Sequence, residues 1–152
     1  MSKFKPIYEF IKRALQKRGI YYHPWYRYAD AARHLFLYNC FRKIPDGDIV
    51  ECGVGHGRSL VSLATFARYE GKNRNVYGYD TFTGFPYENI GYFAVPKGRV
   101  RDTLRYHGVR AELVEGSFEN TLSRYNGNIA LLHIDCDLGK SYQIVLDALY
   151  PK

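Results

Sequence analysis

The sequence predicts an α/β fold with a Rossmann-like, doubly wound parallel sheet. From residue 48 onward, strand-like and helix-like segments alternate, as they do in right-handed βαβ units. The runs 48–52 and 129–134 are near-continuous apolar segments, as expected of parallel strands that helices cover on both faces. A turn with glycine at every second position follows the first run. We therefore expect an α/β core over residues 45–152, preceded by an N-terminal helical segment over residues 1–44.

Residues 1–44 are predicted to form a basic appendage with helical and aromatic parts. Residues 4–18 have the apolar spacing of an amphipathic helix. It either packs on the core or attaches to an anionic membrane surface, and packing is favoured because one short helix binds lipid only marginally. The aromatic segment 21–28 serves either as a lid over a ligand or as packing. Residues 29–43 are expected to form a helix with four residues on one face: Ala32, Leu35, Phe36 and Cys40.

The core is predicted to contain four strands and four helices. The strands are expected at residues 48–52, 75–80, 111–114 and 129–134. The helices are expected at about 57–70, 97–107, 119–125 and 139–149, with a loop over 81–96. Gly71 and Pro151 mark the ends of the first and last of these helices. In such a sheet, ligands bind at the carboxyl ends of the strands.

Composition and charge narrow the classes of function. A hydrophobic content of 46% with 24% charged residues is ordinary for a globular protein, and no apolar run is long enough to span a bilayer. Ten of the 22 Lys and Arg residues lie in residues 1–43, against two of the 15 Asp and Glu residues. The core is therefore nearly neutral, which argues against a nucleic-acid partner. Cys40, Cys52 and Cys136 lack Cys-x-x-Cys spacing and no signal peptide is evident, so we expect reduced thiols in a cytoplasmic protein.

An acid precedes the glycine-rich turn, and this combination predicts the ligand. Glycines let the backbone turn sharply and approach a ligand closely. A carboxylate at Glu51 would oppose the pyrophosphate of a dinucleotide but would suit a cation, such as the ammonium or sulfonium of S-adenosylmethionine (SAM). The alternative is an ordinary tight turn between strand and helix. The residues assigned to the cofactor site here are Glu51, Gly53, Gly55, Gly57 and Ser59.

Two further strand ends carry candidate cofactor ligands. Asp80, followed by Thr81, ends the second strand, where an acid can accept hydrogen bonds from both ribose hydroxyls. The alternative is an aspartate that caps a turn at Thr81. After the third strand, Ser117 could bond an adenine edge and Phe118 could lie against its face. Ser117 could equally be the N-cap of the helix that follows.

The fourth strand ends in two alternate carboxylates, Asp135 and Asp137, and Asp135 is also assigned to the cofactor site. They either begin a site for a hard cation such as Mg²⁺ or cap the helix that starts near Gly139. His133, just before them, is expected to be a satisfied core residue. His56, within the glycine turn, is expected to be a loop residue rather than a general base.

Four segments resemble the macrocin O-methyltransferase (TylF/MycF-type) family. They are VECGVG at 50–55, YDTFTGFP at 79–86, VEGSFENTL at 114–122 and IALLHIDCDL at 129–138. The resemblance covers about residues 45–152 and implies a class I SAM-dependent methyltransferase fold, Mg²⁺ dependence and methyl transfer to a hydroxyl, typically on a sugar. It also implies that the glycine loop and Asp80 hold SAM, that Ser117 and Phe118 flank the adenine, and that Asp135, or else Asp137, is the catalytic metal ligand.

The chain also departs from the family pattern. The family continues with a fifth strand that supplies further acidic ligands, and then with an antiparallel pair. Residues 137–140, Asp-Leu-Gly-Lys, carry a glycine and a base where the family has an aromatic residue and an acid. An apolar fourth strand would be left as an unpaired edge. We therefore expect a fragment of a longer protein, or a chain that covers this edge by association, for example as a homo-oligomer.

The function expected from these observations is Mg²⁺-assisted methyl transfer from SAM to a hydroxyl of a sugar or another small molecule. The protein would mainly position the reactants, because the sulfonium carries the reactivity. The first alternative is a non-catalytic or incomplete SAM-binding module. A nucleic-acid methyltransferase is disfavoured by the neutral core, and a nicotinamide-dependent oxidoreductase by Glu51 and the loop spacing.

Overall fold

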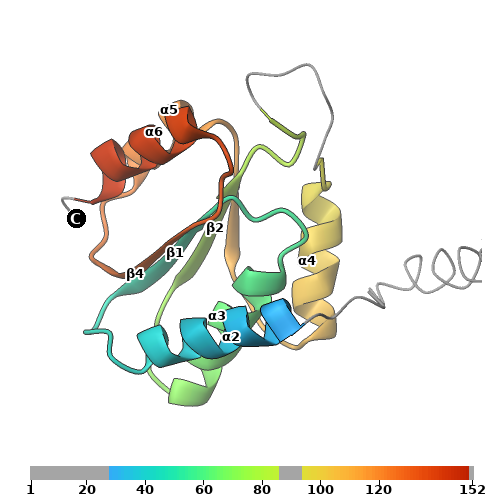
Figure 1. Cartoon of the computed structure of the whole chain (residues 1–152), viewed down its shortest axis with the longest axis vertical. Coiled ribbons are helices and arrows are strands. Elements are labelled where there is room, and N and C mark those ends of the chain that lie inside the picture. The colour runs from blue at the N-terminus through green and yellow to red at the C-terminus, as the bar shows by residue number, and fades with distance from the viewer. Residues whose placement is uncertain (1–27, 86–93, 151–152) are drawn as a thin grey trace, which may run out of the picture.

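The computed structural model describes residues 28–85 and 94–150 (Figure 1). The helix expected over residues 4–18 and the aromatic segment up to residue 27 lie outside these ranges. Part of the loop expected over residues 81–96 lies outside them as well. None of the described helices is both long and apolar enough to cross a membrane.

The described strands form one parallel sheet in the order β3-β2-β1-β4. Its strands are β1 (Asp48–Cys52), β2 (Val76–Asp80), β3 (Glu112–Glu115) and β4 (Ile129–Ile134). In the central strand, Val50 lies in register with Tyr77 on one side and Leu132 on the other. The chain runs outward from β1 through β2 to β3 and then returns to the other side of β1. Strand order therefore reverses between β1 and β4, which is where open α/β sheets bind ligands.

Helices cover both faces of this sheet (Figure 1). Strand alternation turns Ile49 towards one apolar core and Val50 towards the other. The first core also contains residues of α2 (Tyr28–Phe41), α3 (Arg58–Glu70) and α4 (Lys97–Tyr106). The second contains residues of α5 (Phe118–Thr121), the 3₁₀ helix η1 (Leu122–Arg124) and α6 (Gly139–Leu149). The predicted doubly wound α/β fold is confirmed.

The face predicted for α2 is wrong. Leu35 and Phe36, expected to be buried, are 64% and 67% exposed, whereas Leu37 and Phe41 are each only 5% exposed. The helix carries apolar residues on more than one side, so its spacing alone does not identify the buried face. The packing partner determines which face is buried, because the ring of Phe41 contacts the Phe66 ring of α3 at a centroid distance of 5.6 Å.

Candidate active site

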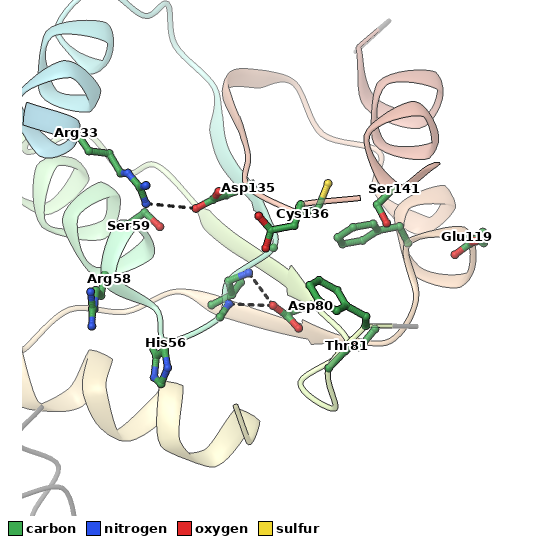
Figure 2. A pocket seen from close by; sticks show the side chains of 17 residues that line it. Arg33, His56, Arg58, Ser59, Asp80, Thr81, Glu119, Asp135, Cys136 and Ser141 are labelled. Atoms are coloured by element: carbon green, nitrogen blue, oxygen red, sulfur yellow. Dashed lines mark hydrogen bonds and ion pairs between the residues drawn. The ribbon is translucent and has the colours of Figure 1, made fainter. Parts of the chain in front are cut away.

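A cavity of about 510 Å³ opens at the carboxyl ends of β1, β2 and β4 (Figure 2). Its size is within the range of sites for small molecules and cofactors. The glycine loop after β1, the start of α3 and the turns after β2 and β4 form its walls. The predicted site residues that line it are Gly53, Gly55, Ser59, Asp80, Thr81, Phe118, Asp135 and Asp137.

Gly53 lets two strand ends meet at the base of this cavity. Its φ of 89° is left-handed, and a Cβ there would overlap the backbone carbonyl of Asp135. The Gly53 N–H donates to Tyr79 O at 2.9 Å, and the Asp135 N–H donates to Cys52 O at 2.8 Å. The absence of a side chain at this position therefore brings Asp135 against the glycine loop.

Gly55 has a different role in the same loop. Its φ is 49°, and a Cβ added there would meet no atom within 4 Å. Since Gly55 lines the cavity, this open space is available to a ligand. The backbone at Gly55 can thus be approached more closely than a side chain would permit.

The Asp80 carboxylate ties the glycine loop to the end of β2. Its Oδ2 accepts the N–H groups of Val54 at 2.7 Å and Gly55 at 3.0 Å, and its Oδ1 accepts the Phe82 N–H at 2.8 Å. The turn-capping contact considered from the sequence is present. Asp80 also lines the cavity, and its contact with a ribose stays a prediction.

Glu51 does not lie at the mouth of the loop. Its side chain is 0% exposed and does not line the cavity. Strand alternation places it on the face of Ile49, where its Oε1 lies 2.8 Å from Nδ1 of His133. Burial raises the pKa of Glu51, and the His133 hydrogen bond opposes this only partly. The sequence suggested a direct contact between Glu51 and a cofactor. The buried position of Glu51 does not offer such a contact.

The end of β4 contributes an ion pair that the sequence did not suggest. Arg33 of α2 places its Nη1 3.6 Å from Oδ2 of Asp135, and Figure 2 shows the two side chains pointing towards each other. Asp137 lines the cavity with a left-handed φ of 59°. Within residues 28–85 and 94–150, no three His, Cys, Asp or Glu side chains form a metal-binding group.

The other predicted residues are divided between the cavity and its surroundings. Phe118, at the start of α5, lines the cavity, whereas Ser117 occupies the N-cap position outside the lining. The Ser117 side chain makes no capping hydrogen bond, but its carbonyl accepts the Asn120 and Thr121 N–H groups at 3.1 Å. Gly57 precedes α3 and also lies outside the lining.

Several lining residues were not predicted from the sequence. His56 was noted there only as a loop residue. Cys136 lies between the two predicted aspartates, so its position was a usable signal; burial raises the pKa of its thiol to about 11. Arg33 carried no local signal, because only the packing of α2 on the core brings it to β4. The lining residues missed are Arg33, Val54, Arg58, Gly84, Phe85, Glu119, Cys136 and Ser141.

Comparisons with known proteins agree with this geometry. Residues 32–152 match the family described as Macrocin-O-methyltransferase (TylF). No curated protein matches the chain. Among solved structures, the O-methyltransferase NovP is similar at 26% identity and a TM-score of 0.71, over 79% of this chain and 60% of NovP.

The calicheamicin methyltransferase CalS11 is similar at 33% identity and a TM-score of 0.71, over 82% of this chain and 61% of CalS11. Its apo form, described as a TDP-rhamnose 3'-O-methyltransferase, is similar at 30% identity and a TM-score of 0.66, over 82% of this chain and 60% of that structure. The chain therefore spans less than two thirds of the length of these structures.

Proposed function

Because the chain belongs to the macrocin O-methyltransferase (TylF) family, we propose that it binds SAM and transfers its methyl group to a hydroxyl of a small molecule. A sugar is the proposed acceptor, since a similar solved structure is described as a TDP-rhamnose methyltransferase. The observation that carries the proposal is the cavity at the reversal of strand order, bordered by a loop that is open at Gly55 and held by Asp80.

The cavity residues fit the parts of SAM. The open space at Gly55 admits a ligand against the backbone. Asp80 uses its carboxylate oxygens for three backbone N–H groups and still has acceptor capacity for a ribose hydroxyl. Phe118 offers an aromatic face for the adenine. When bound, SAM supplies a methyl group made electrophilic by the positive sulfur.

The chain's own task is to hold the acceptor and take its proton. Direct displacement at a methyl group requires the attacking oxygen to be aligned with the bond that breaks, so positioning accounts for much of the rate. Asp135 and Asp137 line the cavity and can accept a hydrogen bond from the acceptor hydroxyl. We assign them to the acceptor side.

The described residues do not complete a site for Mg²⁺. Mg²⁺ favours six oxygen ligands, whereas the described residues offer two carboxylates here, and Arg33 already pairs with one of them. These residues do not by themselves fit the ion. The use of Mg²⁺ stays a prediction.

A SAM-binding module without catalysis is the second candidate. It is favoured by one observation, that Arg33 pairs with Asp135, one of the two carboxylates assigned to the acceptor side. Methyl transfer from SAM to a TDP-sugar by this chain would exclude it. SAM binding without any transfer would support it.

A cytoplasmic location belongs to the same proposal. The described cysteines are free thiols, and Cys52 and Cys136 are buried. A reducing compartment keeps such thiols reduced.

Within residues 28–85 and 94–150, β4 pairs only with β1, so self-association along its outer edge is also proposed.

Calorimetry with SAM tests the cofactor assignment. We expect the unaltered chain to bind SAM and Asp80→Ala to bind it at least about tenfold more weakly, because the loop loses its carboxylate anchor. The same affinity in both proteins, or no binding by the unaltered chain, would contradict the assignment.

A further inference from the structure

The first turn of α6 presents hydrogen-bond donors without acceptors. Ser141 is only 2% exposed, yet it lines the cavity, and Figure 2 shows its side chain at the start of α6 facing this space. Within residues 28–85 and 94–150, the Ser141 hydroxyl makes no hydrogen bond. In the same part of the chain, the N–H groups of Gly139 and Ser141 lack acceptors as well. Polar groups inside a protein normally have partners, so these donors are suited to a ligand.

The same turn is open and positively charged. Leu138 occupies the N-cap position and provides no side-chain cap. A Cβ added at Gly139 would meet no atom within 4 Å. Lys140 is exposed and adds its charge to the partial positive charge of the helix N-terminus. Gly139 and Lys140 stand where the resembled family has an aromatic residue and an acid, so this chain has less bulk and the opposite charge here.

Three donors in one turn favour a ligand with several acceptor oxygens. A single sugar hydroxyl offers one oxygen, whereas a phosphate group offers several and also carries the negative charge that a helix N-terminus stabilises. Asp135 and Asp137 precede this turn in the cavity lining, but Asp135 is paired with Arg33 at 3.6 Å, which lowers the negative charge on this side. Phosphate is therefore the group that this turn fits best.

We infer that the first turn of α6 binds a phosphate group, with the Ser141 hydroxyl as its side-chain donor, and that the acceptor is a sugar joined to such a group, as in a nucleoside diphosphate sugar. The inference rests on the proposed function, which assigns Asp135 and Asp137 to the acceptor side. Since α6 begins two residues after Asp137, a phosphate held there anchors the acceptor beside the carboxylates that receive its hydroxyl.

Thymidine diphosphate (TDP) and thymidine separate the phosphate contacts from the rest of the acceptor site. Calorimetry is carried out on the full chain saturated with S-adenosylhomocysteine, the product that methyl transfer leaves from SAM. We expect the unaltered chain to bind TDP at least about tenfold more tightly than thymidine. Ser141→Ala should weaken TDP binding about tenfold, the loss expected for a hydrogen bond to a charged group, and leave thymidine binding unchanged. Lys140→Glu should also weaken the binding of TDP alone.

Stability separates a binding role of Ser141 from a structural one. Its hydroxyl makes no bond among the residues that the structure describes, so Ser141→Ala should not lower the midpoint of thermal unfolding. A lowered midpoint would show that the hydroxyl serves the fold and would overturn its assignment. Ser62→Ala is the matched control, because Ser62 lies on α3 outside the cavity lining and its hydroxyl donates to Arg58 O at 3.2 Å. It should change neither affinity.

The remaining outcomes distinguish this inference from the proposed function. Failure of the unaltered chain to bind TDP, or equal effects of Ser141→Ala on TDP and thymidine, would overturn the inference while leaving SAM binding in place. Pyrophosphate supplies the phosphate in free form, and tighter binding of pyrophosphate than of TDP would overturn the assignment of the phosphate to the acceptor. If the unaltered chain did not bind S-adenosylhomocysteine, the proposed function would fail and the inference with it.

Discussion

Nδ1 of His133 lies 2.8 Å from Oε1 of Glu51, although the Glu51 side chain is completely buried. The two residues face each other in register across β1 and β4. The second carboxylate oxygen, Oε2, has no hydrogen-bond partner among the residues that the structure describes. This pair links the two strands beneath the glycine loop, and it holds a proton in the interior.

The pair predicts that stability falls as the pH rises. Burial raises the pKa of Glu51; burial alone would lower that of His133, but the hydrogen bond and charge of Glu51 raise it above 6.5. Both shifts make the native state hold more protons than the unfolded state. The His133 contribution is therefore fully present below pH 6.5 and is lost as the pH rises through its raised native pKa.

Urea unfolding measured from pH 6 to pH 9 checks this prediction. The free energy of unfolding should decline by at most about 1.4 kcal/mol per pH unit for one proton. Glu51→Gln should flatten the decline, because the neutral amide no longer raises the pKa of His133. The same slope in both proteins would show that other groups cause it.

The glycine loop offers a matched pair of substitutions. Gly53→Ala places a methyl group against the Asp135 carbonyl at a left-handed φ, so it should lower the free energy of unfolding by about 2 kcal/mol or more. Gly55→Ala meets open space and should cost about 1 kcal/mol, the penalty of its φ. Thermal unfolding compares the two.

The same two substitutions, Gly53→Ala and Gly55→Ala, can also be compared by their effect on cofactor binding. The Gly55→Ala methyl group occupies space that we assign to the ligand, so SAM affinity should drop although the fold is retained. If Gly55→Ala bound SAM as tightly as the unaltered chain, the ligand would not approach the backbone there.

Asp80→Ala should affect stability as well as binding. It removes the acceptor of the Val54 and Gly55 N–H groups, and buried donors without acceptors cost about 1–3 kcal/mol each. The loss in free energy of unfolding is smaller where water can reach the loop and hydrogen-bond these N–H groups. Asp102→Ala, an exposed acid of α4 paired only loosely with Arg105, provides the control and should leave SAM affinity and the free energy of unfolding nearly unchanged.

Metal removal should leave cofactor binding intact. Arg33 pairs with Asp135, and the described residues do not complete a magnesium site. Calorimetric titration with S-adenosylhomocysteine should therefore give the same affinity in EDTA as in millimolar MgCl₂. A markedly tighter interaction with Mg²⁺ would show that the ion contributes to this part of the site.

Local patterns in the sequence were sufficient for most of the fold. The predicted strand 129–134 and the helix 139–149 coincide with β4 and α6, because apolar runs bounded by turn residues indicate their own ends. The predicted helix 119–125 is instead divided into α5 and η1. Such a short segment lacks the repeated turns that would distinguish an α-helix from a 3₁₀ helix.

The site was predictable only where it depends on strand ends. Asp80, Asp135 and Asp137 were predicted because parallel strands end together at one edge, and all three line the cavity. Glu51 was misplaced, since its distance from the glycines along the chain does not reveal which face of β1 its side chain occupies. Arg33 could not be found, because its position depends on how α2 packs against α3.

The packing of α2 links ligand binding in the cavity to the local stability of this helix. The helix rests on α3 through aromatic contacts between Phe41, Tyr38 and Phe66, and it carries Arg33 to the cavity. Any opening motion that lifts α2 withdraws the guanidinium as well. A ligand that occupies the cavity and contacts Arg33 would therefore slow amide exchange in this helix. Detachment of the helix would in turn speed ligand dissociation.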